Sequence, residues 1–208
     1  LKKKNSRNYG HLQGIKAVET IIKSSINMKI PFLTLYTFST ENWKRPDNEI
    51  NFLFSLIRKS LKKNLKKIIK QGIKVNIIGS RLGLPRDINA IVNYIEKKTL
   101  NNKKITLTLA LNYGSKEEII NACKKITAEK NEKITIKNFE NNLYTKNIPD
   151  PEILIRTGGT KRLSNFLLWQ LAYTEIFFIN QLWPDFNEKV FYKIISKFTK
   201  IKRNFGKI

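Results

Sequence analysis

The feature that most constrains this fold is an alternation along the chain of short apolar runs with longer amphipathic helical patterns. Apolar runs at residues 32–38, 75–78, 105–111, 153–155 and 175–179 have the length of strands. Between them, apolar residues recur every three or four positions, which indicates helices that bury one face. Strands alternating with helices predict an α/β fold with a mostly parallel central sheet surrounded by helices.

The helical patterns cover about residues 11–26, 46–72 and 88–98, a stretch from Ser115 that carries Ile119, Ile120 and Cys123, and residues 139–144, 166–170 and 187–202. The second begins with Pro46, Asp47 and Glu49, as suits the positive end of a helix dipole. Ser115 and Glu118 have the spacing of a capping box for the fourth. No linker or internal repeat interrupts the pattern, so we expect one domain over residues 1–208.

The composition is strongly basic, with 40 Lys and Arg against 16 Asp and Glu and a formal net charge of +24. Such a balance raises the alternative of a basic nucleic-acid-binding protein. The lysines occur on every polar helix face, however, which favours a solvated surface over a phosphate-binding stripe. We therefore expect no nucleic-acid partner.

Cysteine usage and hydropathy indicate the cellular setting. The single cysteine, Cys123, excludes a disulfide framework and a thiolate metal cluster. No apolar run has the length of a membrane span, and no signal-peptide core is present. We expect a cytoplasmic protein, for which peripheral contact with the inner face of the membrane stays open.

Two dense polar runs follow predicted strands directly. Residues 39–46 read Ser-Thr-Glu-Asn-Trp-Lys-Arg-Pro, and residues 156–165 contain Arg156, Arg162 and a Gly-Gly pair. Ligands of parallel sheets bind at the carboxyl ends of strands. Guanidinium groups and glycine backbone N–H groups recognise phosphate, so these runs predict a diphosphate site with Arg45 as a further candidate. The alternative is that each arginine pairs with a surface carboxylate.

Two isolated residues have uncommon surroundings. His11, the only histidine, shares a helix face with Arg7 if the first helix extends back that far, and is either structural or a phosphate or proton group. Glu175 adjoins an apolar strand, where a carboxylate is costly unless paired, so it is a candidate Mg²⁺ ligand. Trp169 and Trp183 are expected to pack in the core. The sequence has no Walker loop, Rossmann glycine fingerprint, nucleophile elbow or paired zinc ligands, which leaves a nucleotide enzyme or a metallohydrolase without support.

Several stretches resemble the cis-prenyltransferase family. They are residues 38–46, 110–114, 155–159, 162–170 and 182–186, together with Glu175, in matching order from Arg7 onward. The similarity is greatest to bacterial undecaprenyl diphosphate synthases. It implies a homodimer with a six-stranded parallel sheet and an apolar tunnel. It also implies Mg²⁺-dependent cis condensation of isopentenyl diphosphate with farnesyl diphosphate into a long polyprenyl diphosphate, the lipid carrier of cell-wall synthesis.

The resemblance also implies roles for individual residues. Those expected at the allylic diphosphate are Arg7, His11 and Arg45, and those at the isopentenyl diphosphate are Arg156, Arg162, Leu163 and Ser164. Those expected at the reacting centre are Ser39, Thr40, Glu41, Asn42 and Trp43, of which Ser39, Glu41 and Asn42 are the catalytic candidates. Asn42 occupies the position assigned to proton removal, but an amide is a poor base and is better suited to orienting a substrate. Glu175 would bind the metal, and Thr37 and Ile105 would face the tunnel.

The sequence departs from the family pattern in places. The motif Asp-Gly-Asn-Gly-Arg-Trp, which carries a metal-binding aspartate on the first strand, is not in the sequence. We expect it upstream of Leu1, and the alternative is a non-catalytic partner subunit that has lost it. Thr160 replaces a usual glutamate, Lys161 is atypical, and Asn204 falls where the family has Arg-x-Gly reaching across the dimer. Product length depends on the packing of the tunnel floor, which no single residue determines.

Overall fold

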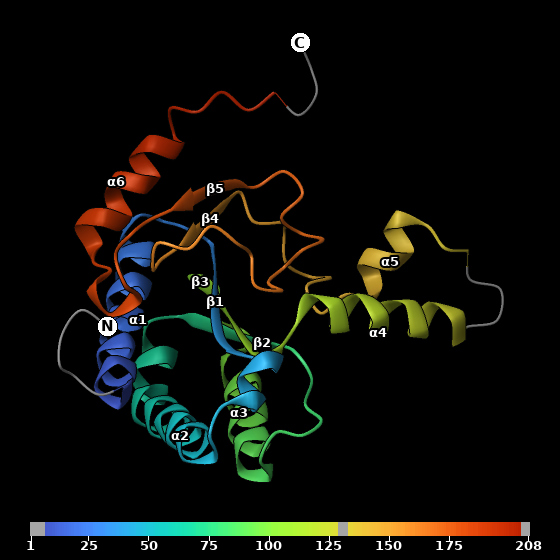
Figure 1. Cartoon of the computed structure of the whole chain (residues 1–208), viewed down its shortest axis with the longest axis horizontal. Helices are drawn as coiled ribbons and strands as arrows, with labels where there is room; N and C mark the ends of the chain where they lie inside the picture. The colour runs from blue at the N-terminus through green and yellow to red at the C-terminus, as the bar shows by residue number, and fades with distance from the viewer. Residues whose placement is uncertain (1–6, 129–132, 205–208) are drawn as a thin grey trace.

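The computed structural model describes residues 7–128 and 133–204. Its helices are α1 (Arg7–Asn27), α2 (Asp47–Lys70), α3 (Arg86–Thr99), α4 (Ser115–Ala128), α5 (Ile136–Asn142) and α6 (Glu188–Phe198), and its 3-10 turns are η1 (Thr40–Lys44) and η2 (Trp183–Asp185). Its strands are β1 (Phe32–Ser39), β2 (Ile73–Ile78), β3 (Ile105–Tyr113), β4 (Ile153–Arg156) and β5 (Glu175–Phe178). The predicted α/β alternation is confirmed (Figure 1).

The strands form two parallel sheets. One has the order β1-β3-β2, with Leu35 opposite Leu109 and Ile77 opposite the same residue on the other side. The other pairs β4 with β5, Ile153 opposite Glu175. The described residues therefore make five strands in two sheets, in place of the six-stranded sheet that the resemblance implies.

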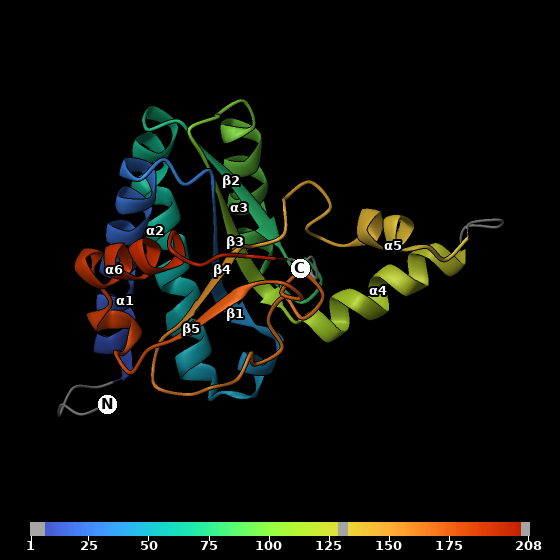
Figure 2. The same ribbon diagram turned by 90° about the horizontal axis from the view of Figure 1, so that it is seen from above.

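Helices α2 and α3 cover one face of the three-stranded sheet, as Figure 2 shows. Ile88, Val92 and Ile95 of α3 are at most 1% exposed and share an apolar cluster with Val75 and Ile105. Burying a side chain of this size stabilises a fold by about 1.5–3 kcal/mol relative to leaving it exposed. This packing fixes β1 and β3, whose carboxyl ends carry polar residues.

Two local predictions are wrong. Residues 166–170 form turns and bends, because Ser164, Asn165 and Leu167 have positive φ angles of 52°, 60° and 45°, which no helix accommodates. The capping box at the start of α4 is also absent. Glu118 is 1% exposed and accepts hydrogen bonds from the Tyr113 hydroxyl at 2.6 Å and the Tyr144 backbone N–H at 2.8 Å. A buried carboxylate needs these donors more than a helix cap does.

Helices α4 and α5 extend together away from the rest of the chain in both views (Figures 1 and 2). Trp169 packs against Phe139 of α5 with ring centroids 4.4 Å apart, so its predicted packing role is confirmed. Apolar side chains are exposed on this arm, Ile120 at 54% and Ile136 at 69%. The arm thus presents an apolar surface to its surroundings.

Candidate functional site

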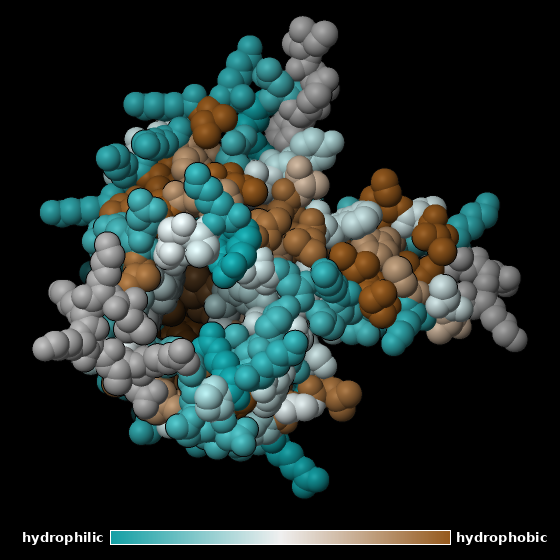
Figure 3. Space-filling model, viewed as in Figure 1, coloured by the Kyte–Doolittle hydropathy of each residue, from teal (hydrophilic) through white to brown (hydrophobic). Residues whose placement is uncertain are grey.

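A cavity of about 2340 Å³ lies between the two sheets. Strands β1 and β4 line it along their whole lengths, with α1, α2 and α6 completing its walls. Figure 3 shows a hollow with an apolar interior and hydrophilic residues around its mouth. Polar residues gather where β1 and β4 end, which gives the cavity a polar end there. Apolar side chains such as Leu33 and Ile155 line its middle, and further polar residues, among them Lys23 and Lys67, line it elsewhere. Of the residues expected to face a tunnel, Thr37 lines the cavity, whereas Ile105 is 1% exposed within the core.

The turn η1 continues β1 without a linker. The Ser39 backbone N–H donates to Asn42 Oδ1 at 3.0 Å, which bends the chain out of the strand. Both residues line the cavity together with Glu41. The side-chain oxygen of Asn42 thus holds the turn, which is consistent with a side chain that orients a substrate rather than one that acts as a base.

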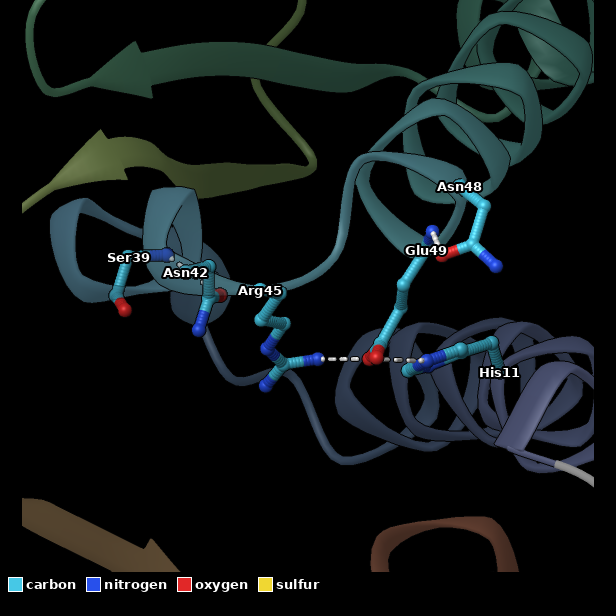
Figure 4. A network of polar contacts seen from close by, with 6 residues as sticks. All are labelled: His11, Ser39, Asn42, Arg45, Asn48 and Glu49. Carbon is cyan, nitrogen blue, oxygen red and sulfur yellow. Dashed lines mark hydrogen bonds and ion pairs between the residues drawn. The ribbon is translucent and has the colours of Figure 1, made fainter.

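His11, Glu49 and Arg45 form a polar network at this end of the cavity (Figure 4). Arg45 Nη1 donates to Glu49 Oε1 at 2.7 Å, and His11 Nε2 lies 3.4 Å from the same oxygen. Glu49, in the first turn of α2, is 8% exposed, so its charge requires such partners. The alternative of a carboxylate partner is therefore correct for Arg45, although the partner is buried.

Arg156, at the end of β4, is held differently. Its Nε donates to Thr160 Oγ1 at 3.0 Å and its Nη1 to Ser164 Oγ at 2.8 Å. Burial, and then repulsion from the Arg162 guanidinium, lower the pKa of Arg156 below its ordinary value. Within the described residues, no ion pair joins Arg156 or Arg162 to a carboxylate. Two neighbouring guanidinium groups without a compensating charge at a cavity mouth form a site for an anion.

The Gly-Gly pair does not take the predicted role. Gly158 and Gly159 adopt positive φ angles of 91° and 74°, which favour glycine. Their backbone N–H groups donate to the carbonyls of Gln181 at 2.7 Å and Ile179 at 2.9 Å. The two N–H groups therefore hold the loop against the segment after β5. An anion at this site would be bound by side chains instead.

A comparison with known families agrees with this arrangement. The model of the family described as "Putative undecaprenyl diphosphate synthase" matches residues 1–206. The chain belongs to this family. An isoprenyl transferase of Prochlorococcus marinus is 45% identical over 213 residues, which cover all of this chain and 78% of that protein. An isoprenyl transferase of Rickettsia bellii is 45% identical over 199 residues, covering 95% and 88% respectively.

Solved structures with the same fold extend the comparison. A probable undecaprenyl diphosphate synthase from Campylobacter jejuni superposes with a TM-score of 0.85 at 34% identity, over 99% of this chain and 95% of that one. Lavandulyl diphosphate synthase from Lavandula x intermedia, in complex with dimethylallyl diphosphate, gives a TM-score of 0.93 at 32% identity, over 97% and 90%. The chain is thus a member of a prenyltransferase family in both sequence and fold.

Two predicted site residues lie outside the cavity wall. The Trp43 indole donates to Asn112 Oδ1 at 2.7 Å and packs on Phe38 and Phe54, with ring centroids 5.1 and 5.5 Å away. Thr40 is half-buried beside Glu41 and does not line the cavity. Trp43 therefore anchors η1 to the end of β3.

The remaining predicted residues are placed as follows. Leu163, Ser164 and Arg162 line the cavity with Arg156. Arg7 is the first residue of α1, but its side chain lies outside the described part of the structure. Trp183 lines the cavity near η2 and donates to the Gly14 carbonyl at 3.0 Å, a packing role that agrees with the prediction.

Glu175 lies apart from the anion site. It is the first residue of β5, opposite Ile153, whereas Arg156 is opposite Phe178 at the other end of the ladder. Three residues of strand separate the two levels by about 10 Å. Within residues 7–128 and 133–204, no three His, Cys, Asp or Glu side chains form a group that could hold a metal ion. Mg²⁺ is commonly held by one or two carboxylates together with waters and substrate phosphates. Glu175, at the other end of the strand ladder from Arg156, does not fit an ion shared with the anion site.

Two site residues were missed by sequence reasoning. Glu49 bridges His11 and Arg45, and its i, i+4 spacing from Arg45 is a signal that could have identified it. Asn165 donates to Glu41 Oε1 at 2.8 Å across 124 residues of sequence. No local pattern identifies such a contact.

Proposed function

We propose that this chain condenses isopentenyl diphosphate with an allylic diphosphate, farnesyl diphosphate, in cis geometry to a long polyprenyl diphosphate. The observation that carries the proposal is the uncompensated pair Arg156 and Arg162 at the mouth of a large apolar cavity. A ligand that matches both features has a highly charged head and a long apolar body. A prenyl diphosphate has this chemistry.

The two cationic clusters at the polar end suit two diphosphates. Arg45 and His11 approach from η1 and α1, and Arg156 and Arg162 from β4 and the loop after it. We assign the allylic diphosphate to the first cluster and isopentenyl diphosphate to the second. Ser164, which accepts from Arg156, belongs to the second.

In the proposed reaction, the bond between the allylic carbon and the diphosphate oxygen breaks and diphosphate leaves. The isopentenyl double bond attacks that carbon and a carbon–carbon bond forms. A carbon next to the resulting cation then gives its proton to the released diphosphate, and the electrons of that C–H bond form the new double bond. Arginines stabilise the charge that develops on the leaving group. The apolar body of the cavity excludes water from the carbocation and receives the growing chain.

The proposal includes a strand in the gap between the sheets. Strands β1 and β4 both line the cavity, and in the described residues each pairs with a neighbouring strand on one side only. Unpaired strand edges favour an extended segment between them. We assign the space along the edges of β1 and β4 to the strand with the Asp-Gly-Asn-Gly-Arg-Trp motif, and the part of the cavity beside α1 and α2 to the prenyl chain. The aspartate of the motif would hold Mg²⁺ at the diphosphates, whereas Glu175 begins β5 at the opposite end from Arg156. Dependence on Mg²⁺ is thus a prediction, and chelation of the ion should abolish turnover.

The quaternary and cellular parts of the proposal rest on surface features. The exposed apolar residues of the α4–α5 arm support a homodimer. In the described residues, no helix is both long and apolar enough to cross a membrane. We propose a cytoplasmic enzyme of lipid-carrier and cell-wall synthesis that meets the membrane at its surface when it delivers product.

The test is an elongation assay with farnesyl diphosphate, labelled isopentenyl diphosphate and Mg²⁺. It compares the 208-residue chain with the same chain preceded by a segment that carries the motif. We expect long labelled polyprenyl diphosphates from the extended form. Absence of product from a folded, dimeric extended form would contradict the proposal.

A second candidate function is a non-catalytic partner subunit. The observation that favours it is that the described residues hold no cluster of carboxylates for a metal. This candidate predicts isopentenyl diphosphate binding without turnover, with activity only after mixing with a complete relative. A basic nucleic-acid binder would instead show salt-dependent affinity that survives Arg156→Ala.

A further inference from the structure

We propose that Asn165 is a positioning residue that holds the η1 turn and the arginine-bearing loop in register through its side-chain amide. The inference deepens the proposed function, and its kinetic part rests on that function. Asn165 lies directly after Ser164 and far from η1 in sequence. The turn and the loop carry the side chains assigned to the two diphosphates.

The amide of Asn165 bonds through both of its polar atoms. Its Nδ2 donates to Glu41 Oε1 at 2.8 Å and to Glu117 Oε2 at 3.2 Å, and its Oδ1 accepts from the Lys116 backbone N–H at 2.8 Å. Its backbone carbonyl accepts from the Ser115 N–H at 2.8 Å. One residue therefore joins three segments, namely η1, the start of α4 and the loop after β4.

The backbone around Asn165 is in an unfavourable conformation. Ser164, Asn165 and Leu167 have φ angles of 52°, 60° and 45°, a left-handed region that non-glycine residues rarely adopt. Asparagine tolerates it better than most residues. Such a conformation persists when the surrounding contacts impose it. The contacts of Asn165 therefore fix the direction of the Ser164 hydroxyl, which accepts from Arg156 at 2.8 Å.

Gly114 makes this junction possible. A Cβ atom at this position would collide with Glu117 Oε2 and would lie 2.6 Å from Thr40 Oγ1 and 2.7 Å from Asn165 Nδ2. Three side chains from three segments meet over this glycine. A side chain at position 114 would therefore displace the polar atoms that meet there.

The junction also controls charge. Burial raises the pKa of Glu41, but hydrogen bonds, the largest from Asn165, outweigh burial and hold that pKa below its ordinary value. The other titratable groups facing Glu41 are Tyr36 on β1 and Glu117 on α4. Burial, and then the negative charge of Glu41, raise the pKa of Tyr36 to about 12. The Asn165 amide thus favours the ionised form of Glu41, although the same amide also donates to the carboxylate of Glu117.

The first experiment is independent of activity. The pKa of the Glu41 carboxyl is measured by ¹³C NMR in the wild-type chain, in Asn165→Ala and in Asn165→Asp. The control is Asn121→Asp, which changes an amide that bonds the Tyr144 hydroxyl at 3.3 Å outside the cavity. We expect the pKa of Glu41 to rise in both Asn165 variants and to stay constant in the control. An unchanged Glu41 pKa in either folded Asn165 variant would overturn the proposal.

The second experiment uses the elongation assay. Asn165→Asp keeps the acceptor for the Lys116 N–H but loses the donor to Glu41, so we expect kcat/KM for isopentenyl diphosphate to fall roughly 100-fold at neutral pH. As pH falls, the carboxyl introduced by this substitution takes up a proton and regains a donor, so the deficit relative to wild type should shrink. A deficit that is constant with pH would overturn the positioning role. The assay uses the extended form that carries the motif, with and without Asn165→Asp. If the extended form with Asn165 makes no product, the proposed function fails while the Glu41 titration still tests Asn165.

Discussion

The two arginine clusters at the polar end of the cavity differ in how their charge is balanced. Arg45 donates at 2.7 Å to the buried carboxylate of Glu49, which also faces His11. Arg156 donates to two hydroxyls, on Thr160 and Ser164, and its cationic neighbour repels it. Among the described side chains, Arg45 therefore has a carboxylate partner, whereas Arg156 has hydroxyl partners.

This difference teaches how one cavity can treat two diphosphates unequally. An anion near Arg45 must compete with Glu49 for the guanidinium. An anion near Arg156 replaces no carboxylate and relieves repulsion between two cations. We therefore expect the Arg156 side to dominate ground-state affinity for diphosphate. The Arg45 side has a fixed orientation set by its ion pair.

The largest expected effect is that of Arg156→Ala. Hydrogen bonds to charged groups are worth about 1.5–3 kcal/mol, so kcat/KM for isopentenyl diphosphate should fall roughly 100-fold. Steady-state kinetics with varied isopentenyl diphosphate measures the loss. Arg58→Ala is the matched control, because Arg58 pairs with Asp87 on the surface, away from the cavity. Equal kcat/KM values in the two variants would show that Arg156 does not contribute to isopentenyl diphosphate binding.

Glu49→Gln tests the other side of the comparison. The change removes the buried charge that Arg45 faces, and we expect it to lower the free energy of unfolding by about 2 kcal/mol. Urea unfolding followed by circular dichroism measures this effect. Asp87→Asn, which alters an exposed pair, should leave the midpoint nearly unchanged. A Glu49 variant as stable as wild type would show that the pair contributes nothing to the fold.

Thr160→Val has a smaller expected effect. It keeps the shape of the side chain but removes the acceptor for Arg156 Nε, a bond worth about 1 kcal/mol. The KM for isopentenyl diphosphate should rise roughly fivefold with little change in kcat. Thr127→Val is the control, since that hydroxyl bonds to carbonyls within α4. A fall in kcat at constant KM would contradict a role in holding Arg156 for binding.

The smallest expected effect concerns Glu41 and pH. Its folded pKa lies below the ordinary value of 4.5, so the unfolded chain binds the proton more readily. The stability that Glu41 contributes is therefore fully present above pH 4.5 and is lost as pH falls through the folded value. Glu41→Gln should show a weaker acid-induced loss of stability than wild type below that pH. Parallel acid unfolding curves would contradict this assignment.

Much of the fold could be predicted because the responsible signals are local. The apolar run at 32–38 and the helical spacing over 46–72 predict β1 and α2 to within two residues at each end. Gly72, where the predicted helix ends, has a φ of 69° and follows the C-cap of α2. The signals for these elements are the hydrophobic periodicity and the residues at the ends of each element, and both lie within a single segment of the sequence.

The remainder depended on contacts between distant segments. Glu118 has the spacing of a helix cap, but Tyr113 and Tyr144 draw it into the core. The segment 166–170 is apolar enough for a helix, yet the contacts of Asn165 impose a left-handed backbone there. A tertiary contact overrides a local preference in both cases.

The candidate site shows the same division. The strand-end positions of Arg45 and Arg156 follow from the sequence pattern, and both line the cavity. The partners of the two arginines could not be predicted from this pattern. Glu49 becomes a partner because it is buried, and Ser164 because of a loop whose conformation depends on distant contacts. The role expected for the Gly158 N–H failed for a related reason, since the carbonyl of Gln181 accepts that hydrogen bond.

The most direct test of the unequal clusters is a calorimetric titration of isopentenyl diphosphate into wild type, Arg156→Ala and Arg45→Ala. We expect Arg156→Ala to raise the Kd for isopentenyl diphosphate roughly 100-fold, and Arg45→Ala to change it by less than about threefold. Equal weakening in both variants, or a larger loss in Arg45→Ala, would contradict the claim that the cluster without a carboxylate binds this diphosphate.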